Sequence, residues 1–168
     1  MNYFELFEIP VQLKVDTAEL KQKFYFLSKK YHPDYAAGGS EDQKADALDK
    51  SAILNKAWKT FQDTDATIRY VLLEKGFLEE EEKYELPPAF LMEVLEINEA
   101  LMDAKPGNKP ELQNQVDILQ NEIYEPVKDI VENYTEDTVA EKELLQVKEY
   151  YFKKKYLDRI RRQLREMQ

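Results

Sequence analysis

The tripeptide His32-Pro33-Asp34 is the part of the sequence best suited to specific recognition. Pro33 fixes its own backbone φ angle and restricts the residue before it, so the turn is ordered before any partner binds and loses less entropy on binding. The Asp34 carboxylate suits a bidentate contact with an arginine, while the His32 imidazole can donate or accept a hydrogen bond. These side chains predict a binding tip. The alternative is a turn that carries an ordinary surface histidine.

Amphipathic helices are predicted on both sides of this tripeptide. Asp16 is a good N-cap for the first helix, which should end near Tyr31 because a residue that precedes proline is displaced from helical backbone angles. A loop over residues 35–42 leads into the second helix, which starts between residues 40 and 42. The tripeptide is therefore expected at the end of an antiparallel hairpin. The apolar faces of the two helices are Leu20, Phe24, Leu27 and Tyr31, and Leu54, Ala57, Trp58 and Phe61.

The composition favours an all-α fold and excludes several kinds of site. Glycine is scarce, with four in 168 residues, and helix-forming residues dominate. The net charge of −10 argues against a general nucleic-acid binder, because phosphate neutralisation needs clustered Lys and Arg. With no cysteine and a single histidine, the chain has neither a disulfide framework nor a His/Cys zinc site, and no cofactor is expected.

The sequence also bears on the compartment. No apolar run approaches the roughly 18 residues that a membrane-spanning helix needs. Residues 3–9 enter a foldable apolar pattern at once, without a basic signal-peptide region or an Arg-rich presequence. A cytoplasmic protein is the expectation.

The second half predicts a linker and three more helices. Four consecutive acids over Glu79–Glu82 precede Pro87-Pro88, and residues 77–87 are expected to form a solvated connector. Short connections between three helices favour an antiparallel bundle over residues 88–168. The helices are predicted over residues 89–104, 110–134 and 136–168, with a kink or break in the second at Pro126. Arginines near the C-terminus suit the negative end of the last helix dipole, namely Arg159, Arg161, Arg162 and Arg165.

The helix predicted over residues 89–104 carries two apolar stripes. A helix at the edge of a three-helix bundle can bury one stripe well, so the other should be partly exposed to a partner. Methionine in the second stripe suits an adaptable binding surface. The alternative is that both stripes pack in the core. The first stripe is Phe90, Val94, Ile97 and Leu101, and the second is Leu91, Met92, Leu95 and Met102.

Tyr31-His32-Pro33-Asp34 between two such helices resembles the J-domain of DnaJ-type co-chaperones, over about residues 2–76. The resemblance implies a J-domain over residues 1–76. It also implies that the tripeptide and the basic face of the preceding helix contact a DnaK-type chaperone and trigger its ATP hydrolysis. The residues implied in chaperone binding are His32, Pro33, Asp34, Lys21, Lys29, Lys30 and Asn55.

Other motifs are similar to those of the HscB-type iron–sulfur co-chaperones. They are residues 51–58 (SAILNKAW), 70–72 (YVL), 90–96 (FLMEVLE) and 156–158 (YLD). Most other J-domain proteins continue with a Gly/Phe-rich segment and cysteine-rich zinc modules, which this sequence lacks. The resemblance implies the scaffold protein IscU as client and an HscA-like chaperone as partner, and it favours a bacterial-type protein. The residues implied in scaffold binding are Leu91, Met92, Leu95, Glu96, Glu99 and Tyr156.

Two other functions remain open. A J-domain adaptor for a different client would share the N-terminal half and differ in its C-terminal target. A helical enzyme with His32 as general base is weaker, because Asp34 lies two residues away across a rigid proline and no nucleophile or second acid is suitably spaced. The sequence therefore predicts a co-chaperone that is not itself an enzyme.

Overall fold

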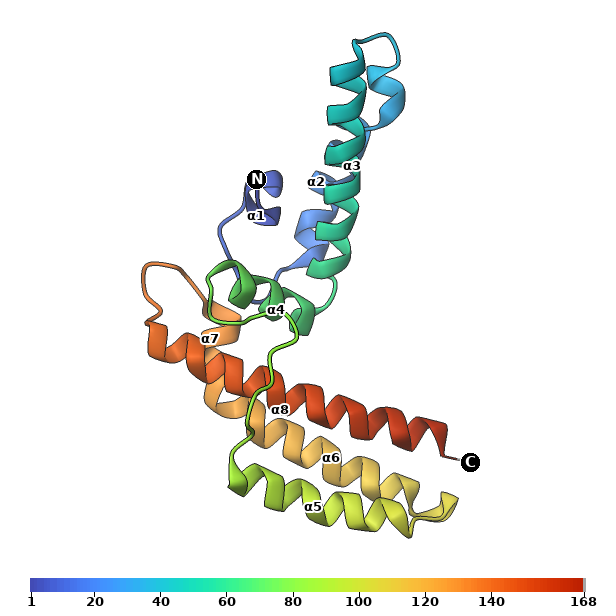
Figure 1. Cartoon of the computed structure of the whole chain (residues 1–168), viewed down its shortest axis with the longest axis vertical. Coiled ribbons are helices and arrows are strands. Elements are labelled where there is room, and N and C mark those ends of the chain that lie inside the picture. The colour runs from blue at the N-terminus through green and yellow to red at the C-terminus, as the bar shows by residue number, and fades with distance from the viewer. Residues whose placement is uncertain (168) are drawn as a thin grey trace. The chain divides into compact units, whose positions relative to one another are not determined.

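The computed structural model describes residues 1–167, and all regular secondary structure within this range is helical (Figure 1). The predicted all-α fold is confirmed. None of these helices combines the length and the apolar character that a bilayer span requires. The elements are α1 (Tyr3–Phe7), α2 (Thr17–Lys30), η1 (Pro33–Ala36), α3 (Glu41–Phe61), α4 (Thr64–Glu74), α5 (Pro88–Met102), η2 (Pro106–Asn108), α6 (Lys109–Tyr124), η3 (Glu125–Val127), α7 (Lys128–Asn133) and α8 (Glu141–Glu166).

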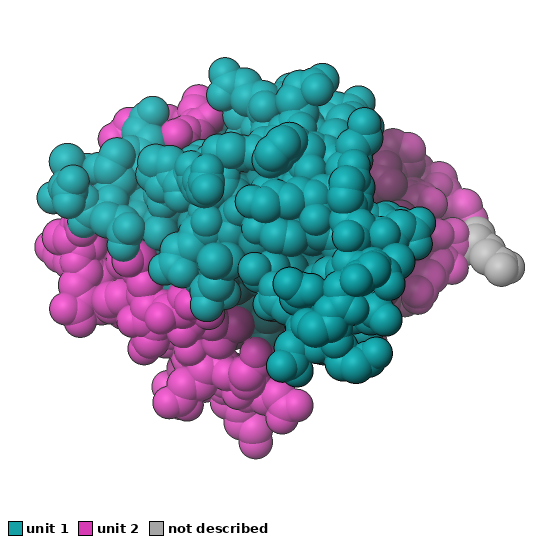
Figure 2. Space-filling view, turned by 90° about the horizontal axis from the view of Figure 1, so that it is seen from above, with its two compact units in different colours: residues 1–71, 133–138 teal, residues 72–132, 139–168 magenta. Residues whose placement is uncertain are grey.

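The chain divides into two compact units, which Figure 2 distinguishes by colour. The first unit contains residues 1–71 together with residues 133–138, and the second contains the other described residues. The division falls inside α4. Whether residues 1–76 and 88–168 form separate domains, as the sequence predicts, stays a prediction.

Helices α2 and α3 of the first unit form an antiparallel hairpin (Figure 1). The side chain of Asp16 caps α2, accepting hydrogen bonds from the backbone N–H groups of Ala18 and Glu19 at 3.1 and 3.2 Å. A reciprocal capping box starts α3: the N–H of Gln43 donates to the hydroxyl of Ser40 at 3.2 Å, and the N–H of Ser40 donates to the side-chain oxygen of Gln43 at 2.9 Å. Local hydrogen bonds therefore fix where both helices begin.

An aromatic cluster joins α1 to this hairpin. The ring of Phe61 in α3 lies 5.1 Å from that of Phe4 and 5.4 Å from that of Phe7, and all three are buried. Phe24 of α2 stacks on Trp58 of α3 with ring centroids 4.5 Å apart. Aromatic pairs at these separations contribute beyond the burial of their surface. The cluster therefore packs the base of the hairpin, at the end of α3 that lies away from the tip.

Gly76 ends α4, as the sequence predicts. Its φ angle of +79° lies in the left-handed region that favours glycine. The N–H of Phe77 donates to the carbonyl of Leu72 at 2.9 Å, and the N–H of Gly76 donates to the carbonyl of Leu73 at 3.1 Å. These two hydrogen bonds form a Schellman motif, which turns the chain out of the helix into the linker.

Helices α5, α6 and α8 of the second unit lie side by side as a three-helix bundle (Figure 1). The predicted break at Pro126 is confirmed, because α6 ends at Tyr124, η3 follows, and α7 resumes at Lys128. The last helix begins at Glu141, later than predicted, because a turn in which the N–H of Thr138 donates to the carbonyl of Thr135 at 3.3 Å precedes it.

Arg161 ties α8 to α6. Its guanidinium lies 2.7 Å from the carboxylate of Asp117 and donates to the side-chain oxygen of Gln120 at 2.8 Å. A charge-assisted contact between helices is geometrically specific, so Arg161 helps to set the register of the bundle. This contact gives Arg161 a structural role beyond the predicted interaction with the helix dipole.

The linker is solvated only in part: Glu79, Glu80 and Glu81 are exposed, as the sequence predicts, but Glu82 and Tyr84 contact α8. The carboxylate of Glu82 lies 2.7 Å from the ammonium of Lys148 on α8, and both side chains are less than one-fifth exposed. The ring of Tyr84 stacks on Phe152 of α8 with centroids 4.5 Å apart. Lys148 and Phe152 lie one turn apart, so α8 offers a cation and an aromatic face together. No pattern within the linker itself could reveal this surface.

The contacts between the linker and α8 shift the pKa values of Glu82 and Tyr84. The hydrogen bond from Lys148, with another from the backbone N–H of Glu79, holds the pKa of the Glu82 carboxyl below its ordinary value of 4.5. Burial of Tyr84, together with the nearby carboxylates of Glu149 and Glu82, raises the pKa of its phenol above 10.0. At neutral pH the Glu82 carboxyl is therefore ionised and can form its ion pair with Lys148.

Glu82→Gln should lower the free energy of unfolding by about 1 kcal/mol at pH 7, because it removes a charge-assisted hydrogen bond. The carboxyl has a lowered pKa in the folded state, so its contribution is present above pH 4.5 and is lost as the pH falls through the folded-state pKa. Urea unfolding at pH 7 and at about pH 3 should show the difference between wild type and variant narrowing in acid. Glu85→Gln, at an exposed linker position, is the matched control and should change little. A difference that is constant with pH would contradict the ion pair.

Candidate functional site

The tip consists of His32, which is the N-cap of η1, and of Pro33 and Asp34, which begin η1. The imidazole Nδ1 of His32 accepts a hydrogen bond from the backbone N–H of Asp34 at 3.2 Å, so His32 caps the 3-10 turn. This turn shortens the predicted loop over residues 35–42. Because Nδ1 is an acceptor here, the proton of the neutral imidazole is on Nε2, which remains as the donor of the ring. The cap and the proline together order the tip from within.

Both polar side chains of the tip are accessible. The side chain of His32 is 55% exposed and that of Asp34 is 91% exposed, and the Asp34 carboxylate lies 3.6 Å from Nδ1 of His32. The tip therefore presents an imidazole donor and a carboxylate close together. This arrangement suits a partner that offers an arginine beside a hydrogen-bond acceptor.

The predicted lysines of α2 are exposed, namely Lys21, Lys29 and Lys30. Lys29 and Lys30 lie beside the tip, whereas Lys21 lies about 14 Å further back along α2. The ammonium of Lys30 lies 5.4 Å from the centre of the Tyr31 ring, and that of Lys50 from α3 lies 5.2 Å from it. Cation–π contacts from both helices thus brace Tyr31 at the base of the tip. Asn55 is also exposed, but it lies about 20 Å along α3 from the end nearest the tip. The structure does not bring Asn55 to the tip.

Two exposed aromatic residues on α2 were missing from the predicted set. Tyr25 is 49% exposed and Phe26 is 65% exposed. The ammonium of Lys21 lies 5.9 Å from the Tyr25 ring. The sequence does contain the signal, because residues 25 and 26 fall between the buried positions Leu20 and Leu27 without matching their spacing. The outward face of α2 is therefore aromatic as well as basic.

The two apolar stripes of α5 separate as the sequence predicts. Phe90, Val94 and Ile97 are buried and Leu101 is half-buried. Glu96 and Glu99 are exposed beside the other stripe. We call that other set the exposed stripe; it consists of Leu91, Met92, Leu95 and Met102, which are 43%, 65%, 45% and 86% exposed.

Tyr156 of α8 lies at the edge of the exposed stripe. The side-chain amide of Asn98 donates to its hydroxyl at 2.8 Å, and its ring meets that of Phe90 edge-on at 6.1 Å. Asn98 follows Leu91 and Leu95 at helical spacing, so these residues share the side of α5 that faces Tyr156. The structure therefore brings together the residues implied in scaffold binding, while their role stays a prediction.

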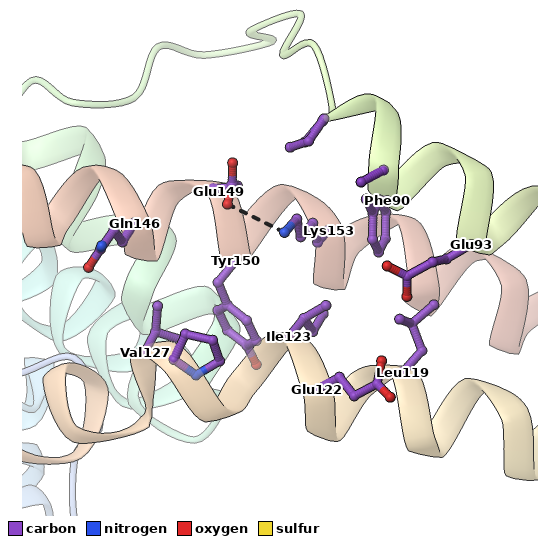
Figure 3. A pocket seen from close by; sticks show the side chains of 13 residues that line it. Phe90, Glu93, Leu119, Glu122, Ile123, Val127, Gln146, Glu149, Tyr150 and Lys153 are labelled. Atoms are coloured by element: carbon purple, nitrogen blue, oxygen red, sulfur yellow. Dashed lines mark ion pairs between the residues drawn. The ribbon is translucent and has the colours of Figure 1, made fainter.

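A cavity of about 280 Å³ opens on a different side of α5, between α5, α6 and α8 (Figure 3). Phe90 and Leu119 form part of its apolar wall. At its mouth, the ammonium of Lys153 lies 3.4 Å from the carboxylate of Glu149 and 5.6 Å from the centre of the Phe90 ring. No residue predicted to bind the chaperone or the scaffold lines this cavity. Among residues 1–167, no group of His, Asp and Glu side chains could hold a metal ion.

Comparison with known proteins covers both units. Residues 86–165 match the family model described as the HscB C-terminal oligomerisation domain. The structure is similar to the crystal structure of the human co-chaperone protein HscB, with a TM-score of 0.78 and 27% identity over 98% of this chain and 81% of that chain. It is also similar to the chaperone HscB from Vibrio cholerae, with a TM-score of 0.62 and 27% identity over 98% of this chain and 99% of that chain.

The hairpin with its tip and the helical bundle together have the fold of a J-domain co-chaperone. Both structural likenesses extend over almost the whole chain, and the family model covers the bundle. Residues 86–165 therefore match the HscB C-terminal domain family, and the chain as a whole is similar to HscB-type co-chaperones.

The triple change Leu91→Ala, Met92→Ala and Leu95→Ala should alter the melting temperature only slightly, because truncating exposed side chains leaves no internal cavity. Leu157→Ala, at a fully buried position of α8, should instead cost about 2–5 kcal/mol. Thermal unfolding of the two variants measures both effects. If the triple variant were as unstable as Leu157→Ala, the exposed stripe would belong to the core.

Proposed function

We propose that this chain stimulates the ATPase of a DnaK-type, HscA-like chaperone through its tip and delivers the iron–sulfur scaffold protein IscU through the exposed stripe, in the cytoplasm. The observation that carries the proposal is the exposed stripe. Four large apolar side chains stay in solvent, whereas Phe90, Val94 and Ile97 on the other side of the same helix are buried. A contiguous apolar surface of this kind is typical of a protein-binding site. The similarity of the chain to HscB-type co-chaperones supports this client and this chaperone.

The tip suits the chaperone because its backbone is ordered before binding and because charged side chains lie on it and on α2. Pro33 and the His32 cap reduce the entropy that binding must remove. The Asp34 carboxylate is free to receive an arginine, and the lysines of α2 favour an acidic partner surface. Tyr25 and Phe26 would add apolar contact area between these charges. The proposed face thus runs from α2 to the tip.

The exposed stripe suits a protein client because it is apolar, adaptable and already formed. Leucine and methionine contribute area, and the flexible thioether chain of Met92 lets the surface fit its partner. Glu96 and Glu99 provide a polar rim. Tyr156 extends the surface onto α8 while its hydroxyl is held by Asn98.

A J-domain adaptor for a different client is the second candidate function. The tip would act in the same way, and the exposed stripe would receive another protein. Affinity capture from the source cell separates the two, because scaffold with chaperone supports the proposal and chaperone without scaffold supports the alternative. An enzyme that uses His32 as general base is less well supported, since His32 lies on an exposed tip that does not exclude water.

His32→Gln or Asp34→Asn should abolish stimulation of the chaperone ATPase and leave the melting temperature almost unchanged, since substitutions at exposed loop positions usually cost within about 0.5 kcal/mol. Asp49→Asn, an exposed change on α3, is the matched control and should stimulate fully. Steady-state ATP hydrolysis by the chaperone measures the effect. Full stimulation by either tip variant would refute the proposed role of the tip.

The triple change in the exposed stripe should weaken binding of the purified scaffold protein by at least about 30-fold, because each apolar contact near the centre of an interface can contribute ~1–2 kcal/mol. Adding Tyr156→Ala should weaken it further. Calorimetric titration measures the affinity. The control is Ile118→Ala with Leu145→Ala, which truncates apolar side chains of similar exposure elsewhere on the bundle and should leave binding intact. Equal binding by the triple variant and this control would reject the exposed stripe as the client site.

A further inference from the structure

Three exposed cations follow one another along α8 beside the exposed stripe. Lys155, Arg159 and Arg162 are separated by four and three residues, which places them on one face of the helix. We call them the basic stripe. Within residues 1–167, no carboxylate forms an ion pair with any of the three. The basic stripe is therefore available to a partner.

The contacts of Arg159 locate the basic stripe relative to Tyr156. The guanidinium carbon of Arg159 lies 5.9 Å from the centre of the Tyr156 ring. That ring in turn meets Phe90, and its hydroxyl accepts the hydrogen bond from Asn98 on α5. Arg159 thus lies next to the seam between α5 and α8, and Lys155 and Arg162 continue the charge in both directions along α8.

Neither helix stability nor packing accounts for the basic stripe. The favourable effect of the helix dipole is confined to the last turn, which contains Arg165 but neither Lys155 nor Arg159. The cations with structural roles are different ones, because Arg161 binds Asp117 and Lys154 binds Asp158. Like charges three and four residues apart destabilise a helix, so the unoccupied basic stripe is unfavourable in the free protein.

Charge is therefore arranged asymmetrically around the apolar contact surface. Glu96 and Glu99 border the exposed stripe on α5, while the basic stripe lies beyond Tyr156 on α8. Most of the net charge of −10 falls after residue 77, so positive charge gathered here contrasts with its surroundings. A surface with opposite charges on its two sides accepts an apolar partner in one orientation and opposes the reverse.

We infer that the basic stripe is a second part of the client site, which binds an acidic patch beside the apolar contact of the client and so fixes the orientation in which the client docks. The inference rests on the proposed function and deepens it by naming Lys155, Arg159 and Arg162 as residues that determine specificity. The acidic character of the rest of the second half disfavours the other anionic partners, nucleic acid and anionic lipid.

The test compares two variants that carry the same change in net charge. Lys155→Gln, Arg159→Gln and Arg162→Gln together remove the basic stripe, and glutamine keeps a similar helix propensity. The control combines Lys83→Gln, Lys128→Gln and Lys142→Gln, all exposed and outside the stripe. Calorimetric titration with the purified apo scaffold protein at about 20 mM and about 500 mM salt gives the affinities, since salt at the higher concentration screens exposed charges.

The stripe variant should bind about 10-fold more weakly than wild type at low salt, with the difference falling to about 2-fold at high salt. The control should stay within about 2-fold of wild type at both salt concentrations, and all three proteins should melt alike. Stopped-flow mixing should place most of the loss in the association rate.

Other outcomes overturn the inference. Equal affinity of the stripe variant and the control would remove the basic stripe from the client site while leaving the proposed function intact. A loss confined to binding of phosphatidylglycerol vesicles or of duplex DNA would assign the stripe to another anion. Absence of scaffold binding by wild type would overturn the proposed function and the inference together. If wild type binds and the triple change in the exposed stripe weakens binding, but the stripe variant binds like wild type, only the inference fails.

Discussion

The helix α5 carries two apolar stripes, and its neighbours α6 and α8 can cover only one of them. Phe90, Val94 and Ile97 face the bundle and leave Leu91 and Leu95 in solvent. This constraint is geometric, because the two sets lie on different sides of one cylinder. It explains why a small bundle can be stable and still present an apolar surface. The core and the exposed stripe share a helix but no side chains, so each can change without the other.

Both candidate surfaces are held in shape by hydrogen bonds that use one end of a side chain and leave the other end for a partner. His32 uses Nδ1 to cap η1, and its Nε2 remains. Tyr156 uses its hydroxyl to accept from Asn98, and its ring remains beside the exposed stripe. A side chain fixed in this way loses little conformational freedom when a partner arrives. These two hydrogen bonds therefore contribute to preorganisation at the tip and at the edge of the exposed stripe.

Much of the fold and of the candidate site follows from the sequence, because periodicity and capping are local. The two apolar stripes of α5, the break at Pro126 and the end of α4 at Gly76 could be predicted from residue types and spacing, while the family resemblance helped to indicate which stripe stays exposed. The packing of the linker against α8 could not be predicted in this way, because the Glu82–Lys148 and Tyr84–Phe152 contacts join residues far apart in the chain.

The sequence also could not distinguish the roles of the individual arginines of α8. Composition alone gives four similar cations near a helix end, with one explanation for all of them. Only tertiary contacts distinguish Arg161, which is held by Asp117, from Arg159, which lies at the ring of Tyr156. The exposure of Tyr25 and Phe26, in contrast, could have been predicted from the sequence, because these residues do not follow the helical spacing of the buried positions Leu20 and Leu27.

The methionines of the exposed stripe make that surface susceptible to oxidation. Met92 and Met102 are 65% and 86% exposed, so their thioether sulfurs are open to peroxide and other oxidants. Oxidation to the sulfoxide turns a flexible apolar side chain into a polar one, which opposes burial against an apolar partner. Methionine sulfoxide reductases reverse the change. An apolar surface built with methionine therefore weakens under oxidative stress and recovers afterwards, whereas one built only of leucine would not respond.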